Sequence, residues 1–187
     1  MIEVEKGFQV TEEQLESLLK GAEFSGDKTN HDIYYDFPDY HFFNNGIKLR
    51  NRNGSFELKI KLPNGSSNEI EDEEDVKKYL NTELPIQGFV DENMIVFSDY
   101  INNRKKYKKG EFVIDVEGLD FVEKVLKGKV IEIELMVSNE NEVSFAIEKI
   151  LNFAKEYGIL HKKIPAKREI YLMVYNLDLY KKLYLNE

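Results

Sequence analysis

Five short segments in which apolar and charged residues alternate limit most strongly how this chain can fold. Side chains on a β-strand point alternately to the two faces of a sheet, so each segment predicts a strand with one apolar face and one charged face. Asn53-Gly54 is a favoured hairpin turn and can join the second segment to the third. The segments are Ile2 to Phe8, Ile47 to Arg52, Phe56 to Leu62, Phe112 to Glu117 and Val130 to Val137, with Ile170 to Val174 as a further candidate.

Helical patterns are fewer than strand patterns. Thr11 and Gln14 form a capping box that predicts the start of a helix reaching Leu19. Apolar residues recur at helical spacing over residues 141–157, and Gly158 is suited to end that helix. Because the strands are not spaced as repeated βαβ units, we expect an α+β fold, with an antiparallel sheet or barrel and helices packed on its outside. Shorter helices are expected at residues 74–80, 121–126 and 177–185, a loop at 21–29 and a turn at 104–109.

Length and charge exclude several classes of protein. A chain of 187 residues is expected to form one domain over residues 1–187 with an ordinary core. The absence of cysteine excludes a disulfide framework and a thiolate metal site. The net charge of −9 argues against a nucleic-acid partner, because neutralisation of phosphates supplies most non-specific affinity. We expect no targeting segment, no membrane association and a cytoplasmic protein that is a monomer or a weak homodimer.

The charges on the predicted strands are segregated by sign. Acidic side chains come from the first, fourth and fifth segments, and basic side chains come mainly from the second and third. Charged residues are poor strand formers and like charges on one face repel, so a ligand or counterion would stabilise such rows. Inside a barrel, the carboxylates would suit Mg²⁺ or Mn²⁺ and the basic wall would suit a polyphosphate. The alternative is an ordinary sheet with one polar, solvent-facing side.

Several short motifs follow one another as they do in the CYTH family of triphosphate tunnel metalloenzymes. The chain resembles this family from Glu3 to about Tyr180, and it resembles the thiamine triphosphatase branch most. The resemblance implies an eight-stranded antiparallel β-barrel that forms a tunnel. It also implies metal-dependent hydrolysis of a small-molecule triphosphate, thiamine triphosphate or inorganic tripolyphosphate, with release of orthophosphate. The motifs are Glu3-Val4-Glu5, Tyr34-Tyr35-Asp36, Leu49-Arg50-Asn51-Arg52, Glu57-Leu58-Lys59, Glu132-Ile133-Glu134 and Pro165-Ala166-Lys167.

The resemblance also implies roles for individual residues. It places Glu3, Glu5, Asp115, Glu132 and Glu134 at metal-site positions, with Glu117 close by. It places Arg50, Arg52, Lys59, Arg104 and Lys167 where phosphate oxygens are held, with Glu69 as a further site carboxylate and Lys61 and Lys48 as further substrate-site positions. Our hypothesis is that Lys59 and the arginines orient the triphosphate while Glu3 and Glu134 hold the main Mg²⁺ or Mn²⁺ ion.

Two positions depart from the family pattern. The motif ExExK ends here in Gly7 instead of lysine, and strand alternation points the neighbouring Lys6 to the other face unless a bulge intervenes. Lys48 stands where the vertebrate thiamine triphosphatases carry a tryptophan. These departures leave two alternatives open. One is an enzyme like the class IV adenylyl cyclases, and the other is a triphosphate-binding module with weak or no catalysis.

Overall fold

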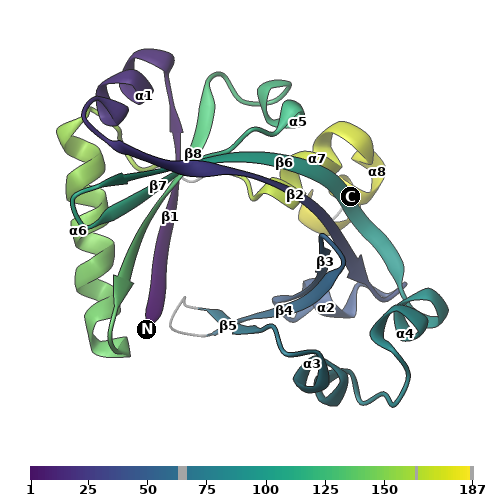
Figure 1. Cartoon of the computed structure of the whole chain (residues 1–187). Coiled ribbons are helices and arrows are strands. Elements are labelled where there is room, and N and C mark those ends of the chain that lie inside the picture. The colour runs from purple at the N-terminus through teal and green to yellow at the C-terminus, as the bar shows by residue number, and fades with distance from the viewer. Residues whose placement is uncertain (63–66, 163, 186–187) are drawn as a thin grey trace. The chain divides into compact units, whose positions relative to one another are not determined.

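The computed structural model describes residues 1–62, 67–162 and 164–185, and eight strands occur in these residues (Figure 1). They form one sheet in the hydrogen-bonded order β1-β8-β7-β6-β2-β3-β4-β5, which begins at β1 and ends at β5. The pairs β1–β8, β7–β8, β6–β7, β2–β3, β3–β4 and β4–β5 are all antiparallel. The strands are β1 (Ile2–Val10), β2 (Glu23–Asp36), β3 (Ile47–Arg52), β4 (Ser55–Lys61), β5 (Ser67–Ile70), β6 (Ile95–Lys109), β7 (Phe112–Val116) and β8 (Lys129–Val137).

The helices are mostly short and lie between the strands along the chain. Thr11 caps α1, and both hydrogen bonds of the predicted capping box to Gln14 are present. No helix in the described part of the chain is both long and apolar enough to cross a membrane. The helices are α1 (Glu12–Leu19), α2 (His41–Asn44), α3 (Glu73–Leu80), α4 (Ile86–Asn93), α5 (Asp120–Glu123), the 3₁₀ helix η1 (Glu140–Glu142), α6 (Val143–Glu156), α7 (Lys167–Tyr175), α8 (Leu177–Tyr180) and the π-helix η2 (Lys181–Leu185).

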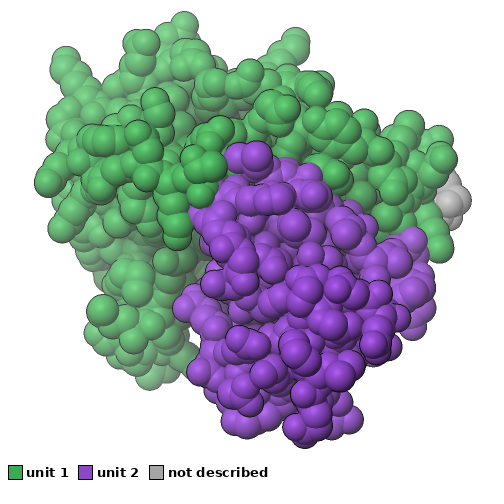
Figure 2. Space-filling model, turned by 45° about the vertical axis from the view of Figure 1, so that its right-hand side comes forward, with its two compact units in different colours: residues 1–29, 102–187 green, residues 30–101 purple. Residues whose placement is uncertain are grey.

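The chain divides into two compact units, coloured separately in Figure 2. Unit 1 consists of residues 1–29 and 102–187, and unit 2 consists of residues 30–101. The two longest strands, β2 and β6, each contain residues of both units. Within unit 1, the Thr29 hydroxyl donates a hydrogen bond of 3.0 Å to Asn103, so the two chain segments that make up this unit meet where unit 2 is inserted.

The core of unit 1 lies under the apolar faces of three strands. Val4 and Phe8 of β1 and Ile133 of β8 are buried against α1 and α6, which contribute Leu18 and Ile150. The alternation of β1 therefore places its apolar side chains against helices and Glu3, Glu5 and Gly7 on the opposite face. Burial of such side chains supplies the main free energy that holds the sheet and helices together.

Unit 2 repeats this arrangement with other elements. Leu49 of β3 and Leu58 of β4 are fully buried against α3 and α4, which contribute Val76 and Val90. The opposite face of β3 and β4 carries the basic residues of the sequence motifs. The predicted α+β class, with an antiparallel sheet and helices against its apolar face, is confirmed.

Three local predictions were wrong. Residues 170–174, a candidate strand, belong to α7, because Glu169 bonds the Ala166 amide at the helix start and Tyr171 and Tyr175 pack one turn apart. Residues 23–29, an expected loop, begin β2, and residues 104–109, an expected turn, end β6. Both segments are polar, and their strand structure comes from pairing with neighbouring strands instead of burial of an alternating apolar face.

Candidate functional site

Three carboxylates of the predicted metal set come together in unit 1. Glu3 and Glu5 lie on the charged face of β1, and Glu5 is the direct register partner of Glu134 on β8. One oxygen from each of the three side chains lies within 4.8 Å of the other two. Such closeness of carboxylates costs repulsion energy unless a cation is near, so the cluster suits a cation.

Glu134 carries the clearest electrostatic signal in this cluster. Its side chain is only 7% exposed, and burial together with the neighbouring carboxylates of Asp115 and Glu3 raises its pKa to about 8. The Lys106 ammonium, 3.2 Å away, acts in the opposite direction and favours the ionised form. A bound dication would favour that form further, because opposite charge lowers the pKa of a carboxyl group.

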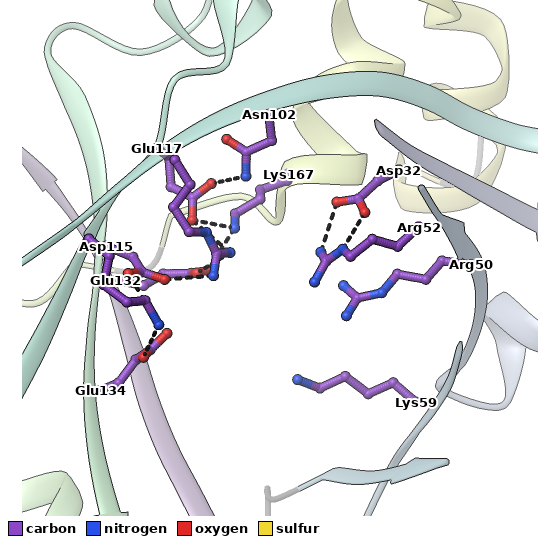
Figure 3. A network of polar contacts seen from close by, with 12 residues as sticks. Asp32, Arg50, Arg52, Lys59, Asn102, Asp115, Glu117, Glu132, Glu134 and Lys167 are labelled. Carbon is purple, nitrogen blue, oxygen red and sulfur yellow. Dashed lines mark hydrogen bonds and ion pairs between the residues drawn. The ribbon is translucent and has the colours of Figure 1, made fainter. Parts of the chain in front are cut away.

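The remaining predicted metal ligands form a second carboxylate group that is already paired with basic side chains. Arg104 contacts Asp115 at 2.6 Å, Glu117 at 3.0 Å and Glu132 at 3.3 Å. Lys167, at the start of α7, lies 2.9 Å from Glu117 and 3.0 Å from Glu132 (Figure 3). Asn102 of β6 also bonds Glu117. The six predicted ligands therefore fall into one cluster of three and one ion-paired group of three.

The ion-paired group shows opposed pKa shifts. Burial raises the pKa of Glu132, but Lys167 and Arg104 outweigh it and the value falls to about 2. For Glu117, burial dominates over the same two cations, and its pKa is raised. The carboxylate charges in turn raise the pKa values of Arg104 and Lys167 above their ordinary range in spite of burial. Both basic groups therefore stay protonated over the whole ordinary pH range.

Unit 2 holds a basic group on β3 and β4. Arg50 donates a hydrogen bond of 2.6 Å to Glu57, its register partner, and a longer one of 3.4 Å to the Tyr34 hydroxyl. Arg52 and the buried Asp32 of β2 form a two-point pair at 2.6 and 2.9 Å. A carboxylate that binds both edges of a guanidinium fixes its orientation as well as its charge.

Lysines line the same face of β4. Lys59 lies 2.6 Å from Glu69 of β5, and this contact outweighs burial and lowers the pKa of Glu69. Lys48 is the register partner of Lys59 and so projects on the same face, as does Lys61 two residues further on. Lys61 is exposed and Lys48 is partly buried. The structure thus gathers the predicted basic residues of β3 and β4 on one face.

Four residues that the motifs did not single out belong to these two groups. Lys106 and Asn102 lie on the same face of β6 as Arg104 and contact Asp115 and Glu117. Asp32 of β2 pairs with Arg52. Glu57 was quoted only as part of a motif. The sequence signal for Asn102 and Lys106 is their two-residue spacing from Arg104. This signal was hidden because residues 104–109 were interpreted as a turn.

The donor set of the three-carboxylate cluster fits a hard divalent cation. Glu3, Glu5 and Glu134 offer only oxygen ligands. A site made of oxygen ligands alone favours Mg²⁺ or Mn²⁺ over Zn²⁺. Mg²⁺ in particular is usually held by one or two carboxylates and keeps several waters or phosphate oxygens. The cluster can therefore supply part of an ion's coordination shell and leave the rest to a ligand.

Comparisons with known proteins identify a family model and solved structures of similar fold. The family model described as the CYTH domain matches residues 1–166. Among solved structures, PH1819 protein from Pyrococcus horikoshii OT3 is 24% identical with a TM-score of 0.62, covering 92% of this chain and 98% of its own. A Hippeastrum protein, described by the name adenylyl cyclase and by a dominant triphosphatase activity, is 18% identical with a TM-score of 0.53, covering 97% and 95%.

A third solved structure, a Vibrio parahaemolyticus protein named as a candidate adenylate cyclase, is 18% identical with a TM-score of 0.61. It covers 91% of this chain and 97% of its own. At these identities the structural likeness shows the fold alone. No curated protein matches the chain significantly.

Proposed function

The chain belongs to the CYTH family, and from this membership and the site chemistry we propose that it is a metal-dependent triphosphatase. The observation that carries the proposal is the cluster of Glu3, Glu5 and Glu134, whose oxygens lie within 4.8 Å of one another on the charged face of the sheet. The substrate is proposed to be thiamine triphosphate or inorganic tripolyphosphate, and the ion Mg²⁺ or Mn²⁺. The absence of tryptophan favours tripolyphosphate, which needs no stacking partner.

The proposed roles divide between binding a metal and binding phosphate. Glu3, Glu5 and Glu134 would hold the ion, which when bound supplies positive charge for the phosphoryl oxygens. Arg50, Arg52 and Lys59 would hold phosphate oxygens, and their carboxylate partners keep these side chains oriented before a ligand arrives. Phosphoryl transfer asks a protein mainly for positioning and charge stabilisation, which is what these residues can supply.

A buried carboxyl group with a raised pKa is a candidate for moving a proton. Burial and the neighbouring carboxylates raise the pKa of Glu134 to about 8 in spite of Lys106, and this pKa favours the protonated form at neutral pH. We propose that Glu134 acts as a metal ligand first, and that Arg104 and Lys167 hold the adjacent carboxylates so that these do not add further repulsion.

The test is an assay of three substrates with the purified full chain. Thiamine triphosphate, tripolyphosphate and ATP are incubated separately with Mg²⁺, Mn²⁺ or a chelator, and orthophosphate, pyrophosphate and cyclic AMP are measured. Release of orthophosphate that stops with the chelator supports the proposal. Cyclic AMP with pyrophosphate would identify a cyclase, and no turnover with tight tripolyphosphate binding would identify a binding module.

A variant makes the phosphate-binding role specific. Lys59→Ala is expected to lower turnover of tripolyphosphate by about tenfold or more, because it removes a positive charge that stabilises the phosphoryl group. The matched control is Lys78→Ala, which removes a lysine of the same unit that is 74% exposed and paired only on the surface of α3. Equal turnover in the two variants would contradict the role of Lys59.

A further inference from the structure

Position 7 of β1 is where the family motif carries a lysine and this chain carries Gly7. The register of β1 with β8 runs without interruption from Ile2 opposite Val137 to Val10 opposite Lys129. An extra, unpaired residue would break this one-to-one pairing, so β1 has no bulge. Lys6 therefore remains on the face of Val4 and Phe8, which are buried under the helices, and it does not replace the missing cation.

An apolar side chain takes up the space beside Gly7. A methyl group added to Gly7 would lie 3.4 Å from Cδ1 of Ile164, which is ordinary van der Waals contact. Ile164 belongs to the segment that leads to Lys167 at the start of α7. The position that would present an ammonium in the family motif is thus bordered by a hydrocarbon group in this protein.

A lysine on another strand of unit 1 reaches the same row of carboxylates. The register pairs Lys106 with Asp115, Asp115 with Glu132, and Glu132 with Gly7, so the four residues form one row across β6, β7, β8 and β1. Directly paired residues project to the same face of a sheet. Lys106 Nζ lies 3.2 Å from Glu134 and 3.5 Å from Asp115, next to the three-carboxylate cluster.

Lys106 differs from Arg104 and Lys167, which also contact carboxylates of this row, in its freedom to reach a ligand. Its side chain is 43% exposed, whereas those of Arg104 and Lys167 are 17% and 22% exposed. Arg104 contacts three carboxylates at 2.6 to 3.3 Å. Lys167 contacts two carboxylates at 2.9 and 3.0 Å. A lysine on a flexible stem with weaker contacts can move its ammonium at a smaller cost than either of these groups.

We propose that Lys106 supplies the phosphate-binding cation that position 7 lacks. In the free protein its ammonium lies between Glu134 and Asp115, and in the complex it bonds an oxygen of the triphosphate beside these two side chains. This inference rests on the proposed triphosphate substrate and adds to it a residue assignment specific to this chain. Its matched control is Lys105, the preceding residue of β6, which is exposed and points to the other face.

The test measures binding before any reaction. Tripolyphosphate is titrated by calorimetry, in chelator, into the wild type, Lys106→Met, Lys106→Arg and Lys105→Met. Lys106→Met is expected to weaken binding about tenfold, because a hydrogen bond from a charged donor to phosphate is stronger than one between neutral groups. The affinities of Lys106→Arg and Lys105→Met are expected to stay near that of the wild type. Methionine keeps the unbranched stem, so the change is confined to the charge.

A second measurement moves the cation to the motif position. Gly7→Lys combined with Ile164→Ala and Lys106→Met is expected to recover most of the lost affinity, since the alanine removes the side chain that fills the space. If Lys106→Met binds tripolyphosphate as tightly as the wild type and differs only in a lower melting temperature, then Lys106 acts only on the carboxylates of the protein. That result would overturn the inference. If the wild type binds tripolyphosphate but releases no orthophosphate, weaker binding by Lys106→Met still supports this inference while the proposed hydrolysis fails.

Discussion

Lys167 is the side chain whose removal tests the electrostatics of the paired carboxylates most directly. We predict that Lys167→Met lowers the free energy of unfolding by about 3 kcal/mol at pH 7, because breaking a buried ion pair by removing one partner costs on the order of 3–5 kcal/mol. The lowered pKa of Glu132 gives an upper limit of the same size for the electrostatic part of this loss. It is about 2 where 4.5 is ordinary, and at about 1.4 kcal/mol per unit this is roughly 3 kcal/mol, shared with Arg104.

The pH dependence separates this mechanism from a simple loss of packing. Glu132 has a lower pKa in the folded than in the unfolded protein, so its stabilising contribution is fully present above about pH 4.5 and is lost as the pH falls toward about 2. The difference in stability between the wild type and Lys167→Met should therefore shrink over that window. A lost hydrophobic contact of the lysine stem would change little with pH.

Calorimetric melting at a series of pH values measures this difference. For a chain of this length, about 3 kcal/mol corresponds to a fall in Tm of roughly 6–12 °C. Lys162→Met is the control, since Lys162 is an exposed lysine of the same segment, and we expect its Tm to stay within a degree or two of the wild type. An equal Tm loss for Lys167→Met at pH 7 and near pH 2.5, or a loss no larger than that of the control, would refute the reasoning.

Two further predictions concern the scaffold. Thr11→Ala should lower the free energy of unfolding by about 1 kcal/mol in urea titrations, because it removes the observed cap of α1. Thr11→Ser keeps a hydroxyl at the cap and should retain most of the wild-type stability. Gly118→Ala should destabilise by more than about 2 kcal/mol, since its Cβ would lie 2.4 Å from the Asn103 carbonyl oxygen, whereas Gly88→Ala in open space within α4 should stabilise by about 0.5–1 kcal/mol. Similar effects of the two alanines would contradict the close approach at Gly118.

The sequence alone was sufficient where a strand alternates strictly. β3 has the predicted bounds, and β1, β4, β7 and β8 differ by one or two residues at one or both ends, because one face of each is buried and its period of two is visible in the residues. β2 and β6 were missed over much of their length. Their polar residues become strands through pairing with neighbouring strands, and pairing leaves little trace in the local pattern.

The same physical cause limited the prediction of the site. Glu3, Glu5 and Glu134 lie on strands with clear alternation, and their meeting follows from the β1–β8 register. Lys106 lies in the part of β6 that was interpreted as a turn, so its face could not be assigned. The division of the six carboxylates into a group of three near one another and a group paired with Arg104 and Lys167 depends on side-chain distances, which a sequence does not contain.

The insertion of residues 30–101 between two segments of one unit has a practical consequence for dissecting this protein. Every carboxylate proposed for metal binding is encoded outside the insert, while Arg50, Arg52 and Lys59 are encoded inside it. The hydrogen bond from Thr29 to Asn103 places the two cut points close enough for a short peptide linker. The proposed metal ligands, together with Lys106, can therefore be altered without changing the insert, and the three proposed phosphate-binding residues of β3 and β4 can be altered within it.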